Sequence, residues 1–75
     1  MSQPGDVNVD ENLTPEAAVK LAMERERLAN EFYRKCAATV KDPGVRKLFE
    51  FLAAEEQRHH DLLQREHDRF LAREN

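Results

Sequence analysis

The sequence predicts an all-α protein in which two antiparallel helices form a hairpin. The composition is 40% apolar and 36% charged, with two glycines and no tryptophan, which is typical of helical proteins. Apolar residues recur at steps of three and four along two long stretches, which is the period of a helix. The segment Lys41-Asp42-Pro43-Gly44 separates these stretches, and so short a link favours antiparallel neighbours.

The first twelve residues are expected to form a flexible N-terminal tail, with the helical hairpin occupying residues 13–75. The tail carries Pro4, Gly5 and scattered polar residues, and its sequence shows no hydrophobic period. A chain segment of this kind has too little apolar surface to fold by itself.

The first helix is predicted from about residue 15 to about residue 40. Thr14 is the expected N-cap, Pro15 fits the first helical position, and Glu16 suits the positive end of the helix dipole. The row expected to face inward is interrupted by one acid, Glu26. Its members are Ala18, Ala22, Glu26, Ala29, Tyr33, Cys36 and Val40.

The second helix is predicted from about residue 43 to about residue 73, with Asp42 as its cap. Glu56 and His59 lie three residues apart on one face of this helix, within an otherwise apolar row. The row contains Val45, Phe49, Leu52, Ala53, Glu56, His59, Leu63 and Phe70. A carboxylate and an imidazole facing a core cost free energy unless something pairs with them, and a metal ion would do so.

Length and charge exclude several classes of protein. A chain of 75 residues is only marginally stable alone, and a single cysteine excludes an internal disulfide. A net charge of −3 with both signs interspersed argues against a nucleic-acid-binding face, and no apolar run would span a membrane. Because one hairpin would leave many large apolar side chains wet, we expect a second copy to complete a four-helix bundle.

The same dimer would complete a metal site. A carboxylate-bridged dimetal site in a bundle takes a Glu from each of two helices and a Glu-x-x-His from each of the other two. One chain offers Glu26, Glu56 and His59, which is half of this set. Carboxylates and imidazole suit iron or manganese, so the chemistry expected is oxidation of Fe(II) to Fe(III).

The sequence resembles the ferritin-like superfamily in its rubrerythrin branch. The resemblance rests on Glu31-Phe32-Tyr33, on the run from Asp42 to Phe49, and on Leu52-Ala53-Ala54-Glu55-Glu56. It implies that Glu26, Glu56 and His59 bind a di-iron centre, with two irons per dimer, and that Tyr33 lies beside them.

A chain of two helices resembles, more narrowly, the encapsulated ferritins. These form a ferroxidase site between subunits, assemble into rings and are packaged in an encapsulin shell that stores iron. The resemblance therefore implies a cytoplasmic ferroxidase, either free or inside an encapsulin nanocompartment. The alternatives are a rubrerythrin-like peroxide reductase and a helical oligomerisation module without catalysis.

Each candidate residue also has a simpler interpretation. Glu26, Glu56 and His59 could form salt bridges on the helix surface, and Tyr33 could be an ordinary core residue. His60 is expected to face solvent or a neighbouring subunit. His67 lies about three turns beyond Glu56, too far for the same metal, and fits an interface histidine better than a second metal site.

Overall fold

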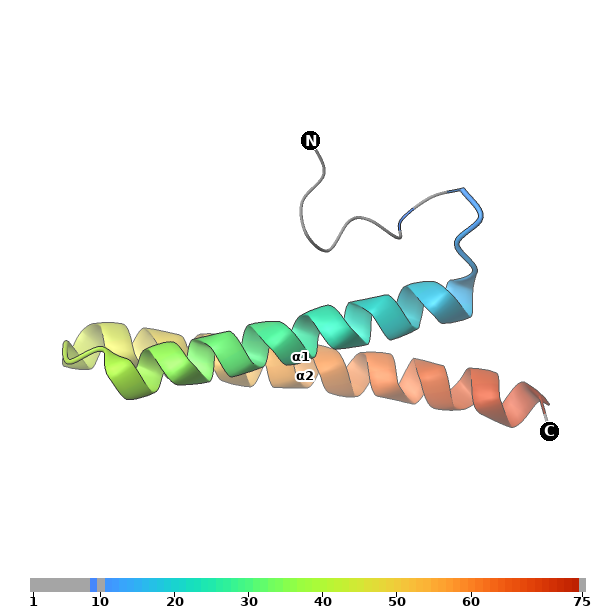
Figure 1. The fold of residues 1–75 in the computed structure, drawn as a ribbon. Helices are drawn as coiled ribbons and strands as arrows, with labels where there is room; N and C mark the ends of the chain where they lie inside the picture. The colour runs from blue at the N-terminus through green and yellow to red at the C-terminus, as the bar shows by residue number, and fades with distance from the viewer. Residues whose placement is uncertain (1–8, 10, 75) are drawn as a thin grey trace.

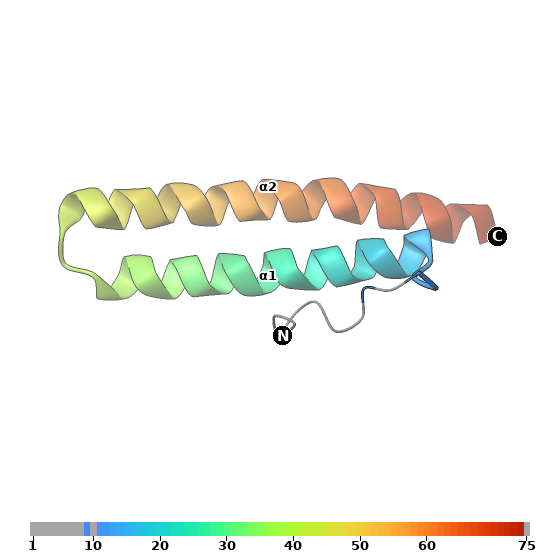
Figure 2. The ribbon, with the colours of Figure 1, turned by 90° about the horizontal axis from the view of Figure 1, so that it is seen from above.

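The computed structural model describes residue 9 and residues 11–74 of the chain, and it contains two long helices. Helix α1 spans Pro15–Thr39 and helix α2 spans Pro43–Glu74. They run antiparallel and side by side, as Figures 1 and 2 show from two directions. The described residues contain no strand, which confirms the all-α prediction. Most of the predicted flexible tail, residues 1–12, lies outside the described residues.

Local hydrogen bonds at the start of α1 explain where the helix begins. Thr14 has an extended backbone, and its hydroxyl accepts a hydrogen bond from the Ala17 amide at 3.1 Å. Pro15 follows at a position where its missing N–H would have had no partner within the helix. The predicted N-cap is therefore confirmed, and it fixes the first turn of α1.

The connection between the helices is short because Asp42 starts α2 almost as soon as α1 has ended. Its carboxylate accepts a hydrogen bond from the Val45 amide at 2.9 Å, and its carbonyl accepts one from the Arg46 amide at 2.9 Å. The Arg46 guanidinium also donates to the carbonyl of Val40, the C-cap residue of α1, at 3.0 Å. These bonds tie the end of α1 to the first turn of α2 and so set the hairpin.

The helices meet along a seam of small and aromatic side chains. Ala53, at 7% exposure, is the one residue classed as buried in the described part of the chain. The ring of Tyr33 stacks on that of Phe49, with centroids 6.0 Å apart, and meets the edge of Phe32 at 5.6 Å. A single layer of two helices therefore leaves most of its apolar surface in contact with water.

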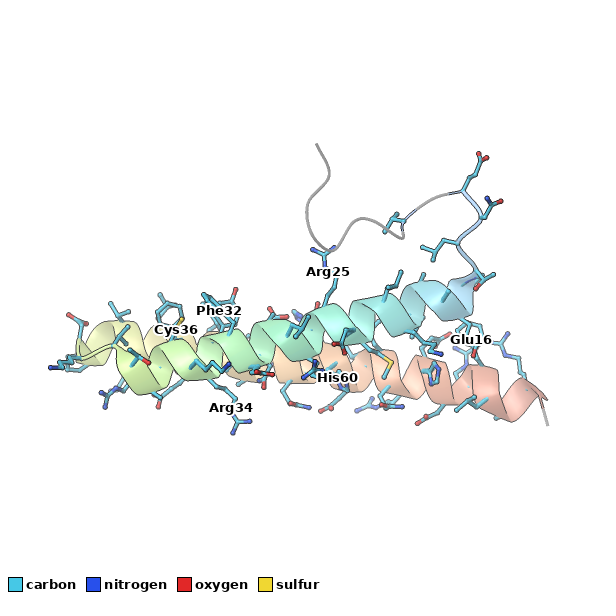
Figure 3. All side chains as sticks on the ribbon, viewed as in Figure 1. Glu16, Arg25, Phe32, Arg34, Cys36 and His60 are labelled. Carbon is cyan, nitrogen blue, oxygen red and sulfur yellow. The ribbon has the colours of Figure 1, made fainter. Side chains whose placement is uncertain are left out.

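The two broad faces of the hairpin differ. One face, the groove face, has a shallow groove lined by residues of both helices: Asn30, Arg34, Ala37, Ala38, Glu50, Ala53, Ala54 and Gln57. The opposite face, which we call the open face, carries the exposed large apolar residues Leu28, Phe32, Leu48, Phe51 and Leu62. Their helical spacing places them on the flanks of α1 and α2 turned away from the groove. Figure 3 shows Phe32 and Arg34 on opposite sides of the helix pair.

Neither α1 nor α2 is long and apolar enough to cross a membrane over the described residues. Much of the remaining exposed surface is occupied by ion pairs within one helix. Examples are Arg27 with Glu24 at 2.7 Å and Arg69 with Glu66 at 2.7 Å. These pairs are exposed and so contribute little to stability, but they keep that surface polar.

Candidate metal centre

Glu26, Glu56 and His59 converge at the middle of the hairpin. Each offers one ligand atom, and these atoms lie within 4.8 Å of one another. It is the one cluster of three or more acidic, histidine or cysteine ligands in the described part of the chain. The prediction that the three residues bind metal stays a prediction, but the structure brings them together.

The imidazole of His59 holds the cluster together. Its Nδ1 lies 3.3 Å from a carboxylate oxygen of Glu26 on the other helix and 3.8 Å from one of Glu56 on its own helix. The contact with Glu26 joins residues 33 positions apart in sequence. Because Glu56 and His59 are three residues apart on α2, the helix alone aligns them, and only the packing of α1 brings in Glu26.

The cluster opens toward the open face. The side chain of His59 is 50% exposed, whereas those of Glu26 and Glu56 are 25% and 19% exposed. His59 belongs to the same row of α2 as Leu48, Phe51 and Leu62, which are all exposed. The carboxylates therefore lie at the floor of an incomplete site, and the imidazole lies at its rim.

The donor set fits a hard or intermediate cation. Two carboxylates and one imidazole are the ligand types that iron and manganese take, and no thiolate lies in the cluster. Two partly buried carboxylates so close together also repel each other unless a positive charge lies between them. Three protein ligands are fewer than the carboxylate-bridged dimetal sites of helical bundles use for a pair of metal ions.

Tyr33 lies on the seam but two turns along α1 from Glu26. The contacts of its ring are aromatic, with Phe32 and Phe49. This arrangement agrees with the simpler interpretation of a core residue. A direct role of Tyr33 beside the metal stays a prediction.

The two other histidines lie away from the cluster. His60 and His67 line a small pocket on the groove side together with Lys20, Met23 and Glu24. His60 is half-buried there, and Figure 3 shows it on the side opposite Phe32. The Nε2 atom of His67 is buried without a hydrogen bond and lies 3.9 Å from a carboxylate oxygen of Glu16 on α1. The structure thus places both residues outside the cluster of candidate ligands.

A functional role for Asn30 was not predicted from the sequence. Its side-chain amide donates a hydrogen bond of 2.7 Å across the seam to the backbone carbonyl of Ala53. The signal available in the sequence was an amide four residues after Glu26, on nearly the same side of the helix. An acceptor on another helix's backbone leaves no mark in the sequence, so the partner could not be read from it.

Acids next to the cluster are held by arginines instead. Glu55 lies beside Glu56 in the sequence but pairs with Arg58 at 3.1 Å. Glu24 accepts two hydrogen bonds from the Arg27 guanidinium, at 2.7 and 3.0 Å, and this pairing lowers the pKa of the Glu24 carboxyl. These carboxylates are thus engaged on the surface and stand apart from the candidate centre.

A comparison with known protein families bears on what this cluster is for. The rubrerythrin family model matches residues 3–67, which is most of the chain. The chain belongs to the rubrerythrin family. Membership confirms the resemblance and implies a ferritin-like, iron-binding protein of the di-iron oxidoreductase kind. The corresponding searches found no match among curated proteins and none among solved structures.

Proposed function

We propose that two copies of this rubrerythrin-family chain join to complete a di-iron centre that oxidises Fe(II) to Fe(III). The observation that carries the proposal is the half set of ligands, Glu26, Glu56 and His59, gathered within 4.8 Å. The dimer serves iron storage or detoxification, because it converts reactive Fe(II) into Fe(III). The proposed function requires that two copies assemble and that their shared site supports the oxidation.

The apolar residues of the open face favour assembly of two copies. The five large apolar residues of this face are 51–61% exposed in the single hairpin. Fully burying a Leu or Phe side chain contributes about 1.5–3 kcal/mol, so a second copy placed on this face gains substantially from the hydrophobic effect. Because His59 lies in the same row, a twofold axis through this face brings the two half sites toward each other.

The proposed reaction transfers both electrons and protons to O₂. In the proposed reaction, oxidation of two Fe(II) to two Fe(III) would supply two electrons, which together with two protons would reduce one O₂ to H₂O₂. Bound iron supplies the redox chemistry and the affinity for O₂. Glu26 and Glu56 would hold the metal and supply negative charge, which favours the more highly charged Fe(III). His59 would supply an imidazole nitrogen, and its ring lies against both carboxylates.

The test combines native mass spectrometry and visible absorption spectroscopy of the protein with Fe(II), first without oxygen and then with it. Mass spectrometry should show a dimer with about two bound metal ions. The absorption spectrum should show a ferric band that grows when O₂ is admitted. Glu56→Gln should abolish both metal binding and oxidation. The matched control is Glu50→Gln, since Glu50 is an acid of the same helix that lines the groove on the opposite face.

Other results would overturn the proposal. A protein that remains monomeric with Fe(II), or a Glu56→Gln variant that binds iron as the wild type does, contradicts the shared site. If the reduced protein reacts much faster with H₂O₂ than with O₂, it is a peroxide reductase. Unchanged assembly and melting temperature in a Glu26→Gln, Glu56→Gln double variant with metal present would indicate an oligomerisation module.

The packaging of the dimer in an encapsulin shell is a separate part of the proposal, supported only by the resemblance to encapsulated ferritins. Coexpression with a shell protein and purification of intact shells tests it. The chain should be enclosed in the shells and protected there from added protease. A chain that stays outside the shells contradicts this part and leaves the proposed chemistry untouched.

A further inference from the structure

Asn30 makes an unusual contact for a side chain in a helical hairpin. Its amide reaches across the seam and donates to the main-chain carbonyl of Ala53 at 2.7 Å, in a part-buried position. Within residues 11–74, the hydrogen bonds that join α1 to α2 along the seam are this one and the contact between His59 and Glu26. Of these two, only the Asn30 bond ends on the backbone.

The place of this bond relative to the cluster is specific. Asn30 lies one turn beyond Glu26 on α1, and Ala53 lies one turn before Glu56 on α2. Ala53 is also the most buried residue described, so the bond is located where the helices pack most closely. A single hydrogen bond therefore fixes both helices one turn away from the two carboxylates.

The other contacts described across the seam constrain the register less tightly than a short hydrogen bond to the backbone. They are the stack of Tyr33 on Phe49, with centroids 6.0 Å apart, and the approach of His67 to Glu16 at 3.9 Å. Hydrophobic contact is also non-directional. A shift of one residue along a helix moves a side chain by about 1.5 Å and turns it by about 100°. Such a shift would carry Glu26 away from His59, whereas a hydrogen bond to a backbone atom tolerates only a small displacement.

We propose that Asn30 is a positioning residue for the metal centre, which sets the register of α1 on α2 so that Glu26 meets Glu56 and His59. Asn30 need not touch the metal in this role. The inference rests on the proposed metal site, but it does not depend on which oxidant the protein uses. It also does not require the bond to Ala53 to stabilise the fold, because that carbonyl can still accept the usual hydrogen bond within its own helix.

The test uses Asn30→Leu, which keeps the size of the side chain, removes the donor and improves helix propensity. Co(II) is the probe, because its visible spectrum reports the number and geometry of its ligands and it does not react with O₂ as Fe(II) does. We expect a helix content and melting temperature without metal that equal or exceed those of the wild type. We also expect an affinity for Co(II) about 10-fold weaker, with an altered spectrum.

The matched control is Gln64→Leu. Gln64 is also an amide in a helix, but it donates to Asp68 on its own helix at 3.1 Å. This variant should bind Co(II) with the affinity and the spectrum of the wild type. A purely structural role of Asn30 would lower the melting temperature of the metal-free protein and leave the spectrum of the loaded protein unchanged.

The outcomes separate the inference from the proposed function. If the wild type binds no Co(II), the proposed metal site fails. If the wild type binds Co(II) and Asn30→Leu matches it in affinity and spectrum, the role of Asn30 fails while the site stands. Should Asn30→Leu not fold, Asn30→Ala undergoes the same measurements, and wild-type affinity and spectrum in that variant overturn the inference.

Discussion

At the scale of single residues, the polar side chains between the two helices differ in the partners that they find within the hairpin. Asn30 is satisfied within the hairpin, because its amide has a backbone acceptor at 2.7 Å. Glu26 and Glu56 instead share one neighbour, the imidazole of His59, which lies 3.3 Å from one carboxylate and 3.8 Å from the other. Partly buried carboxylates cost free energy that a bound cation would offset, which is why this cluster is the candidate metal centre.

Glu24 shows how an ordinary surface acid behaves in the same helix. Hydrogen bonds from the Arg27 guanidinium lower the pKa of its carboxyl below the ordinary value of 4.5. Because the folded pKa is the lower one, the pairing stabilises the fold above pH 4.5 and is lost as the pH falls through the folded pKa.

Arg27→Ala is therefore expected to raise the pKa of Glu24 toward 4.5. An NMR titration of the side-chain carboxyl carbon measures this shift. Lys47→Ala, which removes a positive charge near the start of α2, should leave the titration of Glu24 unchanged. A pKa of Glu24 that does not move in Arg27→Ala would show that the exposed ion pair does not persist in solution.

At the scale of elements, each helix presents two different flanks. The flank of α2 on the open face carries Leu48, Phe51 and Leu62, whereas its other flank carries Glu50, Ala54 and Gln57. Large apolar residues gathered on one exposed flank are typical of an interaction surface. The structure thereby gives the proposed dimer a specific face.

Phe51→Glu is expected to weaken the dimer by at least about 10-fold, because a charge would be buried where a 60% exposed ring stands in the single hairpin. Sedimentation equilibrium over a range of concentrations measures the dissociation constant. Ala54→Glu introduces the same group on the groove face and should leave the dissociation constant unchanged. The reverse pattern would place the interface on the groove face.

At the scale of the whole molecule, the two helices form a single layer that has almost no buried core among the described residues. A hairpin with one buried residue among those described has little to oppose the entropy of the unfolded chain. The proposed assembly and the proposed metal binding would both add to stability. They would act together, because the same face carries the exposed apolar residues and the rim of the candidate site.

Melting temperature is expected to rise with metal and with protein concentration. At a free Mn(II) concentration 100 times the dissociation constant, a site present only in the folded dimer adds about 2.7 kcal/mol to the free energy of unfolding. Differential scanning calorimetry measures this gain. A Glu26→Gln, Glu56→Gln double variant should show no gain from Mn(II), and an equal gain in that variant would locate the metal elsewhere.

Much of the hairpin can be predicted from the sequence because its signals are local. The cap at Thr14 and the turn at Asp42 depend on hydrogen bonds between residues three or four positions apart, and the structure contains both. The pairing of Glu56 with His59 is equally local, since a helix alone brings those residues to one face. That Glu26 joins them was predicted from its place in the row of the first helix that was expected to face inward.

The sequence by itself determined the two helices, their turn and the ligand types, because each depends on neighbours along the chain. Only the tertiary structure decided that Glu26 reaches His59, that Asn30 bonds to Ala53, and that the cluster opens on the apolar face. The physical reason is that the register and the facing of two helices depend on contacts between distant residues. The helical period of a sequence shows which residues share a face, but it does not set the register or the orientation of one helix against another.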